Sequence, residues 1–261
     1  MPDVEFNINE AKNIINNFIR KIVHSANKQG VVLGLSGGLD SATCLYLAVD
    51  ALNKNSVFPI ILPYKESDPV NTEDALELVK KVGVKYKKLD ITPIADTYLD
   101  SMKVRDKIRR GNFLARIRMA ILYDFAKALN CLVMGSGNKT ERLIGYTTLW
   151  GDMGCDLMPL GDIYKTQVRE LASSLNIPEK ILKKAPSADL WQGQTDEGEL
   201  GLKYEDIDGI LMMFFDMGWG REWIFAEGYS KEKIERVLQL YRSTEFKRRM
   251  PPYPSVTTPE E

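Results

Sequence analysis

The sequence predicts an α/β fold in which a mainly parallel sheet lies between layers of helices. Apolar segments at 31–35, 57–62 and 131–136 are typical of short buried strands, and longer segments with helical spacing of apolar residues separate them. A glycine-bearing loop, SGGLDS at 36–41, joins the first strand directly to a helix. Strands that alternate with helices form parallel sheets covered on both faces. We therefore expect a Rossmann-like three-layer sandwich.

Each element of the N-terminal half has its own signal. Apolar residues recur at helical spacing from Ile8 to Val23, and Gly30 is expected to end this first helix. A helix with an acidic first turn follows the second strand, and a proline in the first turn starts another. The expected order after the first helix is strand 31–35, helix 42–52, strand 57–62, helix 71–82, a weaker polar strand at 85–90, a helix starting at Thr92-Pro93, helix 111–129 and strand 131–136.

The C-terminal half is less regular. Residues 138–162 and 186–201 are polar and rich in glycine, without clear periodicity, whereas 164–175 and 230–250 have helical patterns. Long segments without regular elements inside a compact domain are usually functional. No repeat, low-complexity block or linker interrupts the chain, so we expect residues 1–261 to form one domain.

Composition excludes several classes of protein. The 261 residues include 35 Lys+Arg and 36 Asp+Glu, a formal net charge of -1, so bulk charge does not attract nucleic acid or an anionic membrane, and we expect neither partner. A single histidine, His24, excludes a multi-histidine metal site. Cys44, Cys131 and Cys155 form no CxxC pair, and free cysteines fit the reducing cytoplasm, where we expect the protein.

The glycine loop has the features of an anion site. In an open parallel sheet, ligands bind at the carboxyl ends of the strands, where a helix N-terminus offers free N–H groups. Gly37 and Gly38 allow close approach of the backbone, although the loop matches neither GxxxxGK[ST] nor GxGxxG. Asp40 places a negative charge beside the expected phosphate, which makes chemical sense if Mg²⁺ lies between them. In the alternative interpretation, Asp40 and Ser41 only cap the helix.

The loop also resembles the SGGxDS pyrophosphate loop of the ATP pyrophosphatase superfamily, whose members adenylate a substrate oxygen and release pyrophosphate. Three further segments resemble NAD synthetases in particular, and with the loop they cover most of residues 30–250. They are GNFLARIRM at 111–119, GSGNKTERLIGYTTLWGDMGCDLMPLGDIYKTQV at 135–168 and PSADLWQGQTDEGELGLKY at 186–204.

The resemblance implies an ammonia-dependent NAD synthetase without a glutaminase domain. Such a ligase amidates deamido-NAD with ammonia through an adenylated intermediate, giving NAD, AMP and pyrophosphate in the last step of NAD biosynthesis. Mg²⁺ is the implied cofactor and ATP the co-substrate, and a homodimer is the implied assembly.

The resemblance also implies the site residues. The ATP contacts are Gly34, Leu35, Ser36, Gly37, Gly38, Leu39, Asp40, Ser41, Ser136, Lys165 and Ser187. The positions that contact deamido-NAD are Arg116, Leu149, Asp156, Phe246 and Lys247. Asp40 and Glu141 are the implied Mg²⁺ ligands, and Asp40, Lys165 and Asp156 the implied catalytic residues, with Asp156 orienting ammonia or taking its proton.

The chain departs from the family pattern at two of these positions. Leu149 stands where many ammonia-dependent members have lysine, and Phe246 where the tail usually reads His-Lys. Both departures fall on the deamido-NAD side. Ordinary structural roles also remain open, because Glu141 and Lys165 are of a type common on solvated helices and Asp156 could pair with a lysine.

Two other functions compete with NAD synthesis. One is a related ATP pyrophosphatase that amidates or thiolates another nucleotide or tRNA; the near-neutral charge and the lack of paired cysteines argue against tRNA thiolation. The other is a non-catalytic ATP-binding module, which would need neither Glu141 nor Lys165.

Overall fold

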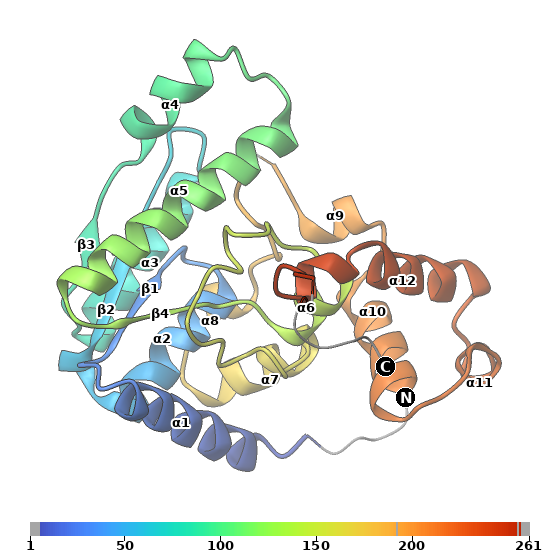
Figure 1. The fold of residues 1–261 in the computed structure, drawn as a ribbon. Coiled ribbons are helices and arrows are strands. Elements are labelled where there is room, and N and C mark those ends of the chain that lie inside the picture. The colour runs from blue at the N-terminus through green and yellow to red at the C-terminus, as the bar shows by residue number, and fades with distance from the viewer. Residues whose placement is uncertain (1–5, 192, 255, 257–261) are drawn as a thin grey trace.

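The computed structural model describes residues 6–191, 193–254 and 256, and it confirms the predicted fold class (Figure 1). A four-stranded parallel sheet has the order β3-β2-β1-β4. The strands are β1 (Val31–Gly34), β2 (Val57–Ile61), β3 (Lys87–Lys88) and β4 (Leu132–Met134). The chain moves outward from β1 through β2 to β3 and then returns to the other side of β1. The sheet therefore has a switch point between β1 and β4, where ligands bind in such folds.

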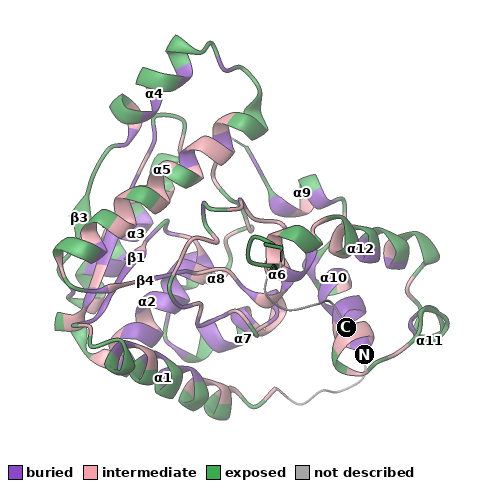
Figure 2. Cartoon of the chain, in the orientation of Figure 1, coloured by how far each residue is buried: buried purple, intermediate pink, exposed green. Residues whose placement is uncertain are grey.

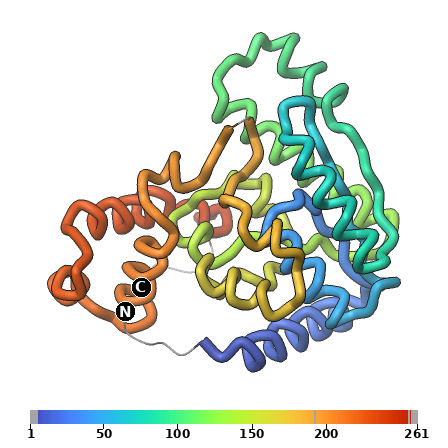
Figure 3. The backbone as a smooth tube through the Cα atoms, turned by 180° about the vertical axis from the view of Figure 1, so that it is seen from behind, coloured from blue at the N-terminus to red at the C-terminus, as the bar shows by residue number. Residues whose placement is uncertain are grey.

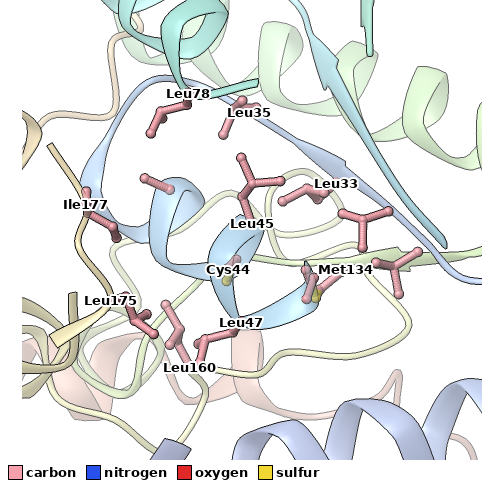
Figure 4. Packing of buried hydrophobic residues seen from close by; sticks show 14 of the residues in the cluster. Leu33, Leu35, Cys44, Leu45, Leu47, Leu78, Met134, Leu160, Leu175 and Ile177 are labelled. Carbon is pink, nitrogen blue, oxygen red and sulfur yellow. The ribbon is translucent and has the colours of Figure 1, made fainter. Parts of the chain in front are cut away.

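Side chains of the strands alternate between two hydrophobic clusters, one on each face of the sheet. On β1, Val31 and Leu33 belong to one cluster and Val32 to the other, as a period of two requires. Figure 4 shows the first cluster, in which Leu33, Leu45 and Met134 lie among buried leucines. This face is covered by α1 (Ile8–Ser25), α2 (Leu39–Leu52), α3 (Pro69–Val82), α7 (Lys165–Ser174) and α8 (Glu179–Leu182), and the opposite face by α4 (Thr92–Ser101) and α5 (Lys107–Ala128).

A third hydrophobic cluster holds together helices that lie beside the sheet. Leu143 of α6 (Lys139–Ile144) and Tyr164 pack there against apolar residues of the C-terminal helices, among them the buried Met213. Figure 3 shows these helices grouped at one side of the molecule. The remaining helical elements are η1 (Lys54–Ser56), α9 (Asp196–Leu200), α10 (Tyr204–Leu211), η2 (Met212–Asp216), α11 (Arg221–Ala226), α12 (Lys231–Ser243) and η3 (Glu245–Arg248).

Several element boundaries differ from the sequence predictions. The polar strand predicted at 85–90 is reduced to Lys87–Lys88, and the helix predicted at 111–129 begins earlier, at Lys107. Three further differences have a clear structural basis. The first helix ends at Ser25, and Gly30 is instead required by packing, because a Cβ there would lie 1.9 Å from the Ser56 carbonyl oxygen. Helix α2 begins at Leu39 rather than at residue 42, which puts Asp40 in its first turn. The helix predicted at 230–250 is interrupted at Thr244.

Burial follows the layers (Figure 2). Helix α2 is largely buried between the sheet and α1, whereas α1 exposes its outer face. Of the helices in the described part of the chain, none combines the length and hydropathy that crossing a bilayer requires.

Candidate active site

A cleft of about 560 Å³ opens at the carboxyl ends of β1 and β4, at the switch point of the sheet. The lining comes from the glycine loop, the end of β4, α5, α6, α9 and the segment 184–191. We call the sheet with its covering helices the sheet body, and the third hydrophobic cluster with its helices the helical cluster. Both parts contribute residues to this one cleft. The lining includes the predicted ATP contacts Gly34, Leu35, Ser36, Gly38, Leu39, Asp40, Ser41, Ser136, Lys165 and Ser187; Gly37 lies in the same loop, packed against α3.

The glycine loop leaves the start of α2 without a side-chain cap. Gly38 is the N-cap, so the interpretation of Asp40 and Ser41 as helix caps is wrong. Ser41 instead stabilises the loop, because its hydroxyl donates to the Gly38 carbonyl and accepts from the Ser36 N–H. Gly37 has φ +80°, and a Cβ there would lie 2.1 Å from the Asn71 carbonyl oxygen. The open N-terminus of this 14-residue helix makes the loop suitable for an anion.

Beside the loop, one lysine lies between two carboxylates that the sequence separates widely. The Lys165 ammonium forms an ion pair with Asp40 and lies 3.2 Å from Glu141 Oε1, and its side chain is only 4% exposed. Burial alone would lower the pKa of Lys165, but Asp40 and Glu141 outweigh it and raise that pKa, so the lysine stays charged. Burial raises the pKa of Glu141, with Asp40 adding to the effect and Lys165 opposing it.

The supporting hydrogen bonds explain how these three groups meet. Asn138 caps α6 by accepting from the Glu141 N–H at 3.0 Å, and its amide nitrogen donates to Asp40 Oδ1 at 3.0 Å. The buried carboxylate of Asp208 accepts from the Thr140 hydroxyl and from the Thr166 N–H. The Thr140 hydroxyl in turn accepts from the Lys165 N–H at 2.9 Å. One acid from α10 therefore fixes the starts of both α6 and α7.

The residues predicted to contact deamido-NAD are more scattered. Lys247 lines the cleft and donates to the carbonyls of Gly145 and Thr147 at 2.7 and 2.6 Å, and burial lowers its pKa. Arg116, Leu149, Asp156 and Phe246 do not line the cleft.

Local contacts account for those four side chains. Arg116 is exposed and donates to the Leu149 carbonyl at 3.2 Å, and Phe246 is 61% exposed. Asp156 accepts from the Val133 N–H at 2.7 Å and from the Tyr123 hydroxyl at 3.0 Å, and therefore braces the start of β4. Their roles toward substrate stay predictions.

The sequence analysis missed several charged residues that line the cleft, and three of them have contacts that matter for the site. Arg118 lines the cleft and donates to the Leu62 carbonyl at 3.0 Å, and burial lowers its pKa. Asp196 is buried, with one carboxylate oxygen accepting from Tyr204 and the other without a hydrogen-bond partner among the described residues. Lys184 contacts the glycine loop itself. The sequence did contain a signal for Arg118. Residues two apart on a helix lie on different faces, so Arg116 and Arg118 could not both face solvent fully, and this spacing favours one of them pointing inward.

The chemistry of the cleft is that of a polyanion site. It combines an open helix N-terminus, basic side chains and two carboxylates whose oxygens suit Mg²⁺. Within the described residues, no group of three or more His, Cys, Asp or Glu side chains could hold a metal ion by itself. A cation there would need phosphate oxygens or water to complete its ligands.

Comparison with known proteins agrees with this chemistry. Residues 11–251 match the model of a family described as NAD synthase. The chain is 40% identical over 251 residues to the NH3-dependent NAD+ synthetase of Fusobacterium nucleatum, covering 96% of this chain and 97% of that protein.

The solved structures that resemble this chain include synthetases of the same kind. An NH3-dependent NAD synthetase from Campylobacter jejuni, in complex with the nitrate ion, has a TM-score of 0.82 at 32% identity, covering 96% of this chain and 100% of that one. A structure named NMN synthetase, from Francisella tularensis, has a TM-score of 0.86 at 34% identity, covering 96% and 99%.

Proposed function

The chain belongs to the NAD synthase family and is a ligase that forms NAD from deamido-NAD, ammonia and ATP, and we propose that the cleft beside loop 34–41 is its ATP site. In this proposal the loop and the start of α2 hold the pyrophosphate part of ATP. Ser136 and Ser187, which line the cleft, are further ATP contacts.

The observation that carries the proposal is the position of Lys165 between Asp40 and Glu141, at the open end of α2. The first chemical step joins two anions, because a substrate carboxylate attacks the α-phosphorus of ATP. Catalysis of such a step depends on positioning and on neutralisation of charge. Lys165 supplies a permanent positive charge at this point, and the helix N-terminus supplies unpaired N–H donors.

Asp40 and Glu141 are the residues that would hold Mg²⁺. They fit this ion because they are carboxylates from different elements that already share one cationic partner, and Mg²⁺ commonly takes one or two carboxylates plus substrate phosphates. When bound, Mg²⁺ would neutralise charge on the phosphates. Asn138 orients Asp40, and the capping interaction of Asn138 with Glu141 holds the second acid in place.

The acceptor side of the proposal includes Lys247, whose ammonium lies in the cleft with two of its three N–H groups bound to backbone carbonyls. Arg116, Leu149, Asp156 and Phe246 belong to the same proposal through the family pattern. Ammonia would then displace AMP from the acyl adenylate, with Asp156 as the group that orients ammonia or takes its proton.

A direct assay tests the ATP site. The protein is incubated with ATP, Mg²⁺, ammonium and deamido-NAD, and the nucleotides are separated. We expect equal amounts of NAD and AMP, dependence on Mg²⁺, and loss of turnover by about a hundredfold or more in Asp40→Asn. Near-normal turnover of a folded Asp40→Asn protein would remove Asp40 from the metal and ATP site.

The acceptor needs its own comparison, because one similar structure is named NMN synthetase. Nicotinic acid mononucleotide, the carboxylate whose amidation gives NMN, is therefore assayed in parallel with deamido-NAD. We expect the higher kcat/KM with deamido-NAD, and the reverse order would reassign the acceptor.

We also propose a homodimer in the cytoplasm. Family resemblance supports the dimer, and three free cysteines fit a reducing compartment. Light scattering of the purified protein tests the dimer, and a monomeric mass over the working concentration range would exclude it.

A further inference from the structure

A second lysine, besides Lys165, contacts the glycine loop. Lys184 follows α8, and its ammonium donates to the Gly37 carbonyl at 3.1 Å and to Asn71 Oδ1 at 2.8 Å. It also forms an ion pair with Asp74. An ammonium group has three N–H donors, so these three partners occupy all of them. Lys184 therefore lines the cleft without a donor left for a phosphate oxygen.

The acid that holds Lys184 is unusually well buried. The Asp74 side chain is 3% exposed, and its other oxygen accepts from Lys180 at 2.6 Å. Lys180 is 47% exposed and its hydrogen bonds are to Asp74 and Glu77, not to the loop. Asp74 thus has one lysine that reaches the glycine loop and one that does not.

Both ends of one loop peptide are fixed by these contacts. Lys184 holds the Gly37 carbonyl, while the N–H of the same peptide, on Gly38, donates to Ser36 Oγ at 3.2 Å. A peptide unit is planar, so restraining its oxygen and its N–H fixes its orientation. Glycine at φ +80° would otherwise permit rotation of this unit at little cost. The close packing of Gly37 on the Asn71 carbonyl brings the loop within reach of Lys184.

We propose that Lys184, anchored by Asp74, is a positioning residue that fixes the Gly37–Gly38 peptide so that the loop and the start of α2 are preorganised for the pyrophosphate part of ATP. This inference rests on the proposed role of loop 34–41 as the ATP loop. Preorganisation lowers the ordering cost of binding, so its loss weakens ATP binding more than binding of the other substrates.

The test compares Lys184→Met with Lys180→Met. Each substitution removes one ammonium from Asp74 and leaves the other lysine in place, so the buried acid keeps a partner in both proteins. We expect Lys184→Met to raise KM for ATP about tenfold or more, with KM for deamido-NAD within about twofold of wild type. Lys180→Met should leave both KM values near wild type.

A third variant separates this inference from the proposed function. Gly38→Ala adds a methyl group to the loop itself, 3.3 Å from Ser36 Oγ, at a residue whose φ of -85° alanine accepts. A raised ATP KM in Gly38→Ala with an unchanged ATP KM in Lys184→Met would overturn the positioning role and keep the ATP loop. Unchanged ATP KM values in both would overturn the ATP loop as well.

A purely structural role predicts a different result. In that case Lys184→Met would lower thermal stability and change kcat or the KM values of both substrates together, which would also overturn the proposal. Circular dichroism checks the fold of each variant. If Lys184→Met does not fold, Lys184→Gln, which keeps an amide donor, replaces it in the same comparison, with the same selective rise in ATP KM expected.

Discussion

Single buried acids organise much of this site, and Asp208 is the clearest example. It lies on α10, outside the cleft, yet it accepts from Thr140 of α6 and from the N–H of Thr166 in α7. Burial raises its pKa, and its hydrogen bonds to Thr140 and Thr166 oppose the rise. A buried acceptor with two donors is costly to replace, because the donors are left without partners.

We therefore expect Asp208→Asn to lower the free energy of unfolding by about 1–3 kcal/mol. Asparagine can keep one acceptor contact but presents an N–H₂ group in place of the other. Urea denaturation measures the loss, with Glu205→Gln, at an exposed ion pair with Arg169, as the matched surface control. The exposed pair should contribute no more than about 1 kcal/mol. Equal losses in the two variants would contradict the organising role of Asp208.

Asp74 gives a pH-dependent prediction. Burial opposes ionisation, but hydrogen bonds from Lys180 and Lys184 outweigh it and lower the pKa of Asp74 below 3.8. A carboxyl whose pKa is lower in the folded state stabilises the protein above its unfolded pKa and loses that contribution as pH falls through its folded pKa. The stability difference between wild type and Asp74→Asn should be constant from about pH 5 to 7 and shrink below about pH 4. Chemical denaturation across this range measures it, and a constant difference throughout would contradict the shift.

At the scale of elements, the short helix α6 positions several groups of the candidate active site. Its six residues carry Glu141, and its capping box joins Asn138 and Glu141 in both directions. Asn138 is fully buried and also donates to Asp40. The cap of this helix is thus part of the candidate active site.

Asn138→Ala should consequently reduce both stability and turnover. We expect a loss of about 1–2 kcal/mol in the free energy of unfolding and a fall in kcat/KM, because Glu141 and Asp40 each lose an orienting contact. Ser230→Ala, which removes the cap of α12 far along the chain, is the control and should reduce stability alone. If the two variants lose stability and keep equal activity, the cap has no role in the site.

The length of a helix decides whether the sequence pattern can predict it, as a comparison of α6 with longer helices shows. The helices α3, α4 and α7 were predictable because they are long enough to show periodicity or have clear first-turn signals. Helix α6 is too short for periodicity, although Asn138 followed by Glu141 three positions later is a capping-box signal that could have found it. At the interruption, Thr244 packs directly on Gly145, a tertiary contact that the local sequence pattern does not reveal.

The site was predictable to the extent that its residues lie in recognisable local motifs. Asp40, Glu141 and Lys165 were named from the resemblance, and the structure brings them together. Lys184 had no such signal, because its link to Gly37 spans 147 positions and depends on the packing of α3 beneath the loop. Asp208 was missed for the same reason, since its partners lie on two other helices.

At the scale of the whole molecule, the cleft joins parts of the structure that have separate hydrophobic clusters. The sheet body supplies the glycine loop, and the helical cluster supplies α6 and α9. The charges of Asp40, Lys165 and Glu141 meet at this junction. A ligand that spans the cleft therefore contacts both parts and favours their native arrangement.

ATP with Mg²⁺ should accordingly stabilise the whole fold. A ligand that binds only the native state adds RT ln(1 + [L]/Kd), about 2.7 kcal/mol at a hundredfold excess over Kd. In scanning calorimetry, we expect the sheet body and the helical cluster to unfold in one transition. The midpoint temperature of that transition should rise when ATP and Mg²⁺ are present. Asp40→Asn should lose most of this rise and keep its ligand-free midpoint within a few degrees. A rise confined to one of two separate transitions would contradict a site shared by the two parts, because a ligand bound to both stabilises both.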